Sequence, residues 1–173
     1  MNRHQRRREN KKQSKTALSQ PELLRAIEIH KSGDFLLAKD IYLKLYSKDS
    51  SNYDLVRHLG ILYQDLKDNE KAYNFFLRAV KLRPNGFEAY NNLGAIHVLN
   101  KNQSLALKCF ERSYSINPNY VPTINNLAGL HHRLHNGGLA LKFAKKSLSI
   151  QPGNALSINQ YAKALVLNNK IEE

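Results

Sequence analysis

The sequence predicts an all-α solenoid, in which antiparallel helix hairpins stack side by side. The first reason is a 34-residue period, which aligns the segments HLGILY (58–63), NLGAIH (92–97), NLAGLH (126–131) and QYAKAL (160–165). The second is the helical spacing of apolar residues within each unit, and the third is a proline that closes each unit. A single helix hairpin cannot bury its apolar face, whereas stacked hairpins share a continuous core.

The first helix of each unit carries apolar or small residues at helical spacing, which places them on one face. In the unit 53–86 these residues are Val56, Leu59, Gly60 and Tyr63. The small residue in the middle of this set permits close approach of the unit's second helix. We expect Ala72 in this unit, and the equivalent alanines of the next two units, to meet it from that second helix.

The chain divides into six segments on this pattern. They are a basic tail predicted to be disordered (1–17), a degenerate repeat (18–52), three full repeats (53–86, 87–120 and 121–154) and a final helix (155–173). Each full repeat closes with a proline, which cannot donate the helical hydrogen bond and therefore ends the second helix. The final helix is either a cap or the first helix of a further repeat. Its residues expected to face inward are Ile158, Tyr161, Ala162 and Leu165.

The 34-residue period, the Leu-Gly pair and the closing proline resemble the tetratricopeptide repeat family over residues 53–154. The resemblance implies a right-handed superhelix whose first helices line a concave groove. It also implies a protein-interaction scaffold that holds an extended peptide there. The segment YNNLGAIH is most similar to the repeat units of O-linked N-acetylglucosamine transferases, which have an asparagine ladder. Carried onto this chain, the ladder consists of Asn92 and Asn126, with Gln160 as an extension.

Candidate groove residues are expected on the stripe of each first helix that is rotated by about 100° from the Leu-Gly face, and beside it. An amide side chain offers one acceptor and two donors, which suits the backbone of an extended peptide. We expect core packing to have no use for these asparagines. The alternative is that they are solvated residues of the helix surface. The candidates are Arg57, His58, Gln64, Asp65, Asn91, Asn92, Asn125, Asn126, His132 and Arg133.

Other kinds of site are not predicted. A clamp for C-terminal carboxylates lacks its residues, since Ile61, Ala95 and Pro122 stand where the resemblance requires asparagine or lysine. His131 and His135 are one turn apart, but no nearby carboxylate or cysteine completes a metal site, so we expect His131 in the core. No phosphate-binding loop, activated nucleophile or carboxylate pair is recognisable. We therefore predict no enzyme activity and no cofactor.

The composition is strongly basic, with 27 Lys and Arg against 14 Asp and Glu and a net charge of +13. The tail concentrates this charge in the candidate polyanion-binding residues Arg3, Arg6, Arg7, Arg8, Lys11 and Lys12. The tail either makes weak phosphate contacts with nucleic acid or is only a solubilising terminus. No segment is apolar and long enough to span a membrane, and the single cysteine fits a reducing compartment. A cytoplasmic location is expected.

Three functions remain open on the sequence. The first is a scaffold that binds another protein or an extended peptide in the groove. The second makes the chain the substrate-recognition front of a larger glycosyl- or sulfotransferase, because the last helix is apolar for a cap and IEE stands where a second helix would begin. The third is an RNA-associated protein that acts through the tail. Neither the ligand nor the oligomeric state follows from the sequence.

Overall fold

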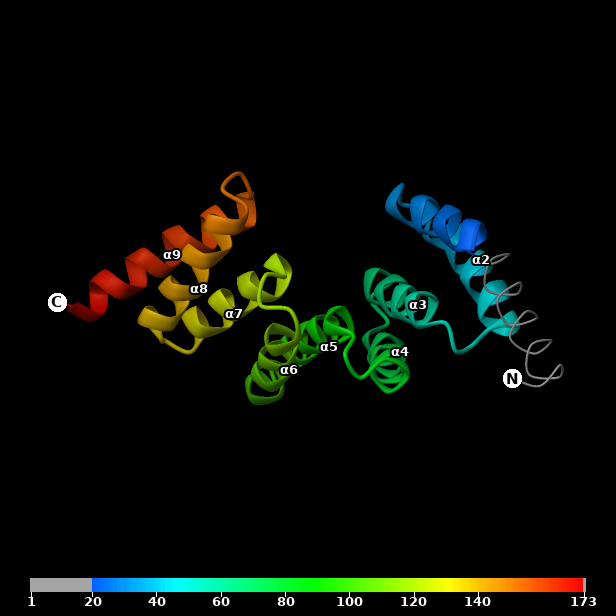
Figure 1. Ribbon diagram of the computed structural model, residues 1–173, viewed down its shortest axis with the longest axis horizontal. Helices are drawn as coiled ribbons and strands as arrows, with labels where there is room; N and C mark the ends of the chain where they lie inside the picture. The colour runs from blue at the N-terminus through cyan, green and yellow to red at the C-terminus, as the bar shows by residue number, and fades with distance from the viewer. Residues whose placement is uncertain (1–19, 173) are drawn as a thin grey trace, which may run out of the picture. The chain divides into compact units, whose positions relative to one another are not determined.

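A computed structural model describes residues 20–172, which contain helices and turns but no strand, and this confirms the predicted all-α class (Figure 1). The predicted basic tail, residues 1–17, lies outside the described residues. Residues 20–31 form the first described helix. The helices that follow are α2 (Phe35–Lys48), α3 (Tyr53–Asp65), α4 (Asn69–Leu82), α5 (Phe87–Leu99), α6 (Gln103–Ile116), α7 (Val121–Arg133), α8 (Gly137–Ile150) and α9 (Ala155–Glu172).

The helices belong to two compact units, Met1–Leu82 and Arg83–Glu173. In the described part of the first unit, α2 packs against α3, and α3 packs against α4. In the second unit, α5 pairs with α6 and α7 pairs with α8. There α6 also contacts α7, while α9 packs on both α7 and α8. Repeated helix pairs of the predicted kind therefore occur in each unit.

The helix ends follow local chemistry. Asp34 and Asn52 precede α2 and α3, and their side chains accept hydrogen bonds from the backbone N–H groups of Leu37 (3.1 Å) and Leu55 (3.0 Å). Such acceptors satisfy N–H groups that the first turn of a helix leaves unpaired. At the other end, α4, α6 and α8 each stop two residues before a proline, as predicted.

The turn inside each helix pair contains one residue with a left-handed backbone. It is Gly33 in the first pair (φ 92°), and Lys67, Lys101 and His135 follow at 34-residue intervals (φ 64°, 58° and 58°). In every one of these turns its N–H donates to the carbonyl three residues earlier, at 3.0–3.1 Å. Glycine adopts this conformation without a steric penalty, whereas residues with a Cβ are strained in it. Only the first turn therefore has the residue best suited to its backbone.

The small residue of the first helix receives an aromatic ring. A Cβ on Gly94 would lie 2.5 Å from Cε1 of Phe110, and Gly60 has the same relation to its own phenylalanine. The sequence-based expectation names an alanine of the second helix and not this ring, which needs the space left by the missing side chain. In the third repeat the expected alanine, Ala140, shares a buried cluster with Ala128. In the third repeat Ala128 and Ala144 occupy the two positions and share one buried alanine cluster. The two residues change together because protein interiors are close-packed.

The last helix buries a different face from the one predicted. Ile158 is 50 % exposed and Ala162 is also exposed, whereas Ser157 and Ala164 are 0 % and 1 % exposed. The other two residues expected to face inward are half-buried. The predicted face corresponds to the residues of α5 and α7 that pack on their own second helix. In the described residues α9 packs on α7 and α8, so the buried face is the one turned toward the preceding repeat.

Candidate functional site

Three first helices of the second unit lie next to one another. α5 contacts α7, and α7 contacts α9. The Gln160 side chain reaches α7, since a Cβ on Gly129 would lie 3.0 Å from Gln160 Nε2. Arg133 and Lys163 follow these two residues by about one turn, and both are exposed. We call the surface that carries Asn92, Asn126, Arg133, Gln160 and Lys163 the first-helix face. Asn92 is half-buried, and its amide nitrogen is buried without a hydrogen-bond partner.

Asn91 and Asn125 are inside the second unit rather than at its surface. Their exposed fractions are 6 % and 2 %. The expectation that core packing has no use for the asparagines is therefore wrong for these two. Each lies where its first helix meets the following repeat, and each makes side-chain hydrogen bonds to that repeat.

A polar triad of Asn91, Ser113 and Thr123 joins repeats 87–120 and 121–154. Asn91 Oδ1 accepts hydrogen bonds from the Thr123 hydroxyl (3.1 Å) and from the Asn126 amide nitrogen (2.9 Å). Ser113 Oγ lies 2.6 Å from Thr123 Oγ1 and 2.8 Å from the carbonyl oxygen of Phe87. All three triad residues are buried. Their mutual hydrogen bonds satisfy polar groups that have lost contact with water.

A second polar triad, Asn125, Ser147 and Ser157, occurs 34 residues later in the chain. Ser147 donates to Asn125 Oδ1 at 2.7 Å, and Asn125 Nδ2 donates to Ser157 Oγ at 3.2 Å. The two serine hydroxyls are 2.7 Å apart. The same chemistry thus holds α9 against the preceding repeat. Neither triad is predicted from the sequence, although polar residues recurring at the 34-residue period were a usable signal.

The Asn126 side chain connects the first triad to the first-helix face. It is half-buried, and its amide nitrogen donates to Asn91 Oδ1. This bond fixes the orientation of the amide. The second proton of the nitrogen and the Oδ1 acceptor are then the groups that a ligand can use. Asn91, although buried, therefore positions a residue of the surface.

The candidate residues of the first unit lie on α3. His58 Nδ1 donates to the carbonyl of Asp54 at 2.7 Å, which leaves His58 Nε2 as the acceptor 3.5 Å from Arg57 Nη2. Burial, together with the nearby Arg57 guanidinium, lowers the pKa of His58 to about 4. His58 is therefore neutral at pH 7. Arg57 and Gln64 are half-buried.

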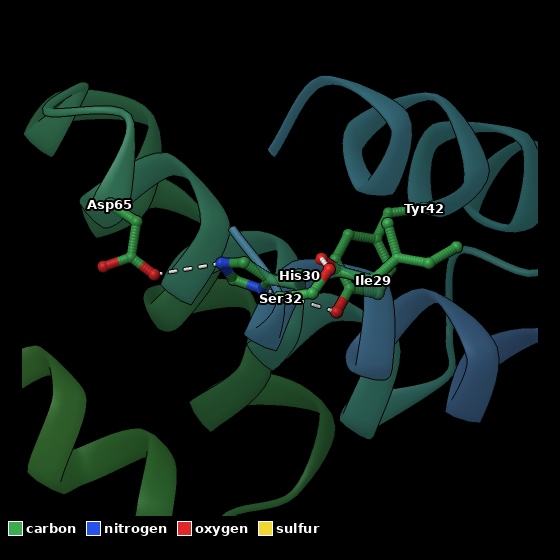
Figure 2. Close-up of polar contacts among 5 residues, drawn as sticks. All are labelled: Ile29, His30, Ser32, Tyr42 and Asp65. Carbon is green, nitrogen blue, oxygen red and sulfur yellow. Dashed lines mark hydrogen bonds and ion pairs between the residues drawn. The ribbon is translucent and has the colours of Figure 1, made fainter. Parts of the chain in front are cut away.

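A histidine contact joins the helix 20–31 to α3, as Figure 2 shows. His30 Nε2 lies 3.0 Å from Asp65 Oδ2, and Tyr42 OH lies 3.5 Å from His30 Nδ1. The His30 side chain is 8 % exposed and that of Asp65 is 47 % exposed. Burial raises the pKa of Tyr42, so its hydroxyl stays protonated. His30 is not among the residues predicted from the sequence, although it corresponds to Gln64 and His132 at the 34-residue period.

His131 lies in the core, as predicted. Its ring stacks on Phe143 with centroids 5.6 Å apart, and Tyr63 stacks on Phe75 at 5.4 Å at the equivalent place in the first unit. Burial lowers the pKa of His131. The neighbouring candidate residue His132 is half-buried. Among residues 20–172, no three His, Cys, Asp or Glu side chains are grouped to hold a metal ion. In that same range no helix has the length and apolar character needed to cross a membrane.

Charge is distributed unequally between the two units. Residues 20–82 include ten basic and nine acidic residues, whereas residues 83–173 include ten basic and four acidic ones. No acidic residue occurs between Glu111 and Glu172, so α7 and α8 have none. The sequence-based predictions do not include this acid-free stretch, because they consider only the basic charge of the tail. Its exposed cations include Arg133, Lys142, Lys145 and Lys163.

Two family profiles described as tetratricopeptide repeat match the chain. One covers residues 87–120 and the other covers residues 58–85. The first range coincides with one predicted repeat, and the second lies within the repeat predicted before it. No curated protein sequence matches the chain.

Several solved structures share the fold. Pseudomonas aeruginosa PilF has a TM-score of 0.82 at 16 % identity, over 91 % of this chain and 72 % of its own. A chain of the APC/C hetero-tetramer Cut9–Hcn1 has a TM-score of 0.76 at 21 % identity over 84 % of this chain, which spans only 30 % of that longer one. The first tetratricopeptide repeat domain of Spaghetti (RPAP3), bound to the HSP90 peptide SRMEEVD, has a TM-score of 0.65 at 15 % identity, over 72 % of this chain and 97 % of its own.

Proposed function

Since residues 58–85 and 87–120 are tetratricopeptide repeats, we propose that this protein is an interaction scaffold that holds another polypeptide against its first helices. An extended segment of the partner lies on the first-helix face of the second unit. The observation that carries the proposal is the recurrence of amide side chains on that face. Asn92, Asn126 and Gln160 follow one another at intervals of 34 residues.

Amide side chains suit this role because each can hydrogen-bond to a peptide backbone whatever the peptide's side chains are. Packed helices lie about 8–10 Å apart, and an extended chain rises about 3.3 Å per residue. Amides on successive first helices would therefore meet about every third residue of the partner. This spacing lets one extended segment reach all three amides, with the buried nitrogen of Asn92 leaving only its Oδ1 as the group that can accept from the partner.

The hydrogen bond between Asn126 and Asn91 supports the proposal further, because it holds one amide in a fixed orientation before any ligand arrives. Orientation of this kind reduces the entropy that binding removes. Among the similar structures, Spaghetti is bound to a peptide, which supports a peptide as the class of ligand. The proposal includes the resemblance of these amides to the asparagine ladder of O-linked N-acetylglucosamine transferases, in which they would contact the backbone of the bound peptide.

Affinity capture from a lysate of the source cell, with and without nuclease, tests this function with intact 1–173 as bait. Proteins that remain bound after nuclease are compared between the natural chain and the double variant Asn92→Ala, Asn126→Ala. We expect the variant to lose its partners while its thermal unfolding changes little. The loss of one hydrogen bond at Asn126 costs about 1 kcal/mol.

A matched control makes the same chemical change elsewhere. Asn74 and Asn119 are exposed and lie outside the first-helix face, so Asn74→Ala with Asn119→Ala should retain every partner. Equal capture by both double variants would remove the asparagine ladder from the proposal. Capture that disappears with nuclease would assign the function to the basic tail.

A further inference from the structure

The charge of the second unit narrows the class of polypeptide that its first-helix face can hold. Between Glu111 and Glu172 the sequence has seven Lys and Arg residues and no Asp or Glu. Helices α7 and α8 lie wholly within this stretch. A cation on either helix therefore finds no carboxylate on its own helix or on the other helix of the hairpin. Lys146 of α8 nevertheless donates to the Tyr114 hydroxyl of α6 at 2.8 Å, whereas the side chain of Arg133 on α7 is exposed.

Two of these cations lie at the same end of the first-helix face. Gln160 contacts α7 at Gly129, and the second polar triad links the first turn of α9 to the first half of α7. The two contacts together show that α7 and α9 run in the same direction. Arg133 follows Gly129 by four residues and Lys163 follows Gln160 by three, so both lie about one turn farther along. Both side chains are exposed.

The chemistry of the face favours carboxylates over nucleic acid bases. Single-stranded nucleic acids are held largely by base stacking on aromatic rings. The five residues that define the first-helix face are three amides and two cations, and the rings next to them in the chain, His132 and Tyr161, are only half-buried. The guanidinium of Arg133 and the ammonium of Lys163 instead make charge-assisted hydrogen bonds with carboxylates. The amides beside them supply donors and acceptors for a peptide backbone.

We infer that the first-helix face binds a segment of another polypeptide that is rich in Asp and Glu. This inference rests on the proposed function and specifies its partner. Side-chain carboxylates of the segment pair with Arg133 and Lys163, while its backbone meets Asn126 and Gln160. Recognition through side chains requires no free C-terminus in the partner.

Fluorescence anisotropy with the intact chain tests the inference. The first probe is a short labelled peptide in which Glu alternates with Gly and whose C-terminus is amidated. The second probe replaces every Glu by Gln, and the third is a single-stranded oligouridylate of the same length. We expect the Glu peptide to bind at least about tenfold more tightly than the Gln peptide, with an affinity that falls as salt rises.

Charge reversal locates the binding. Arg133→Glu combined with Lys163→Glu should weaken binding of the Glu peptide by at least about tenfold. The control reverses Lys44 and Lys81 to Glu, two exposed lysines on α2 and α4 of the first unit, and should weaken binding by less than about threefold. Both variants keep the tail and have the same net charge. Circular dichroism checks their folding, and Arg133→Gln with Lys163→Gln replaces the reversal if that variant unfolds.

Each other outcome overturns the inference in a distinguishable way. Equal binding of the Glu and Gln peptides overturns the acidic partner but leaves the scaffold function intact. Equal loss in the control variant assigns the binding to overall charge. Tighter binding of the oligouridylate that is lost on reversal of Arg133 and Lys163 assigns the face to nucleic acid. Failure of both peptides to bind overturns the inference, and it overturns the proposed function as well only if lysate capture also yields no partner.

Discussion

Three equivalent positions are filled by leucines in the first unit and by hydrogen-bonded polar residues in the second. The leucines are Leu23, Leu45 and Leu55, which are 4 %, 3 % and 3 % exposed. The residues 68 positions later are Asn91, Ser113 and Thr123, and the set after that is Asn125, Ser147 and Ser157. All of them are buried.

The difference shows that one repeat architecture accepts two kinds of contact between neighbouring repeats. Apolar burial stabilises without direction, whereas hydrogen bonds require particular partners at particular angles. The hydrogen bonds of Asn126 and His58, the first-helix residues next to the two sets, differ accordingly. Asn126 donates to Asn91, but its equivalent His58 has Leu23 at the position of Asn91 and donates to its own helix at Asp54 instead. The first polar triad therefore orients Asn126 on the first-helix face, and Leu23 offers His58 no such acceptor.

Leu55→Thr should have the largest effect on stability. It introduces threonine, the residue at the equivalent position 123 of the second unit, into the leucine set. It removes buried apolar area and adds a hydroxyl whose asparagine and serine partners are absent. We expect a loss of about 3 kcal/mol in the free energy of unfolding, measured by urea denaturation with circular dichroism. Leu36→Thr, at a site that is 72 % exposed, is the control and should change stability by less than about 0.5 kcal/mol. A small loss at Leu55 would show that this set tolerates an unpaired hydroxyl.

The leucine set lies beside a titrating group, whereas neither polar triad contains one. The pKa of His58 is about 4 in the folded chain and about 6.5 in the unfolded chain, so the unfolded state binds the additional proton between these values. Stability from this group is complete above about pH 6.5 and is lost as the pH falls toward about 4, by about 3 kcal/mol in total.

His58→Asn introduces the residue found at the equivalent positions of the next two repeats. As the pH falls from 7 to 4.5, the natural chain should lose more unfolding free energy than this variant, in urea titrations at several pH values. His97 and His131, whose pKa values burial also lowers, are common to both proteins and cancel in the difference. A difference that does not vary with pH would show that His58 is not held neutral.

Asn91→Leu converts the central residue of the first polar triad to its counterpart in the leucine set. The Thr123 hydroxyl and the Asn126 amide nitrogen lose their acceptor, and we expect a loss of about 2 kcal/mol. Hydrogen exchange in α5 and α7 measures this loss locally. Asn119→Leu, at an exposed site, is the control. Unchanged exchange would show that leucine serves equally well at this position.

Thr123→Val should have the smallest effect. Valine keeps the shape of threonine, Ser113 retains the carbonyl of Phe87, and Asn91 retains the amide of Asn126. We expect a loss of about 1 kcal/mol by the same hydrogen-exchange measurement. A loss as large as that of Asn91→Leu would place the centre of the triad at Thr123 instead.

Much of the fold follows from the sequence because the signals are local and repeated. The 34-residue period predicts the helix pairs, the prolines predict where α4, α6 and α8 end, and the core position of His131 follows from its correspondence with Tyr63. These inferences need only helical periodicity and the chemistry of proline.

The errors share one physical cause. A first helix in the middle of an array is covered on two sides, by its own second helix and by the neighbouring repeat, whereas the periodicity argument assigns it a single buried face. Asn91 and Asn125 therefore count as surface residues on the sequence although neighbouring repeats bury them. The same assumption predicts that Ile158 of α9 is buried, whereas its side chain is half exposed. Sequence alone does not state which of the two sides is covered.

The central claim is that first helices, rather than second helices, hold the partner. A photo-reactive amino acid placed at Leu99 of α5, the equivalent of Arg133, tests it against the same amino acid at Leu139 of α8. The two sites are comparably exposed, at 53 % and 41 %. After irradiation in nuclease-treated lysate, we expect polypeptide adducts at Leu99 and none at Leu139. Adducts at Leu139, or equal yields at both sites, would contradict the claim.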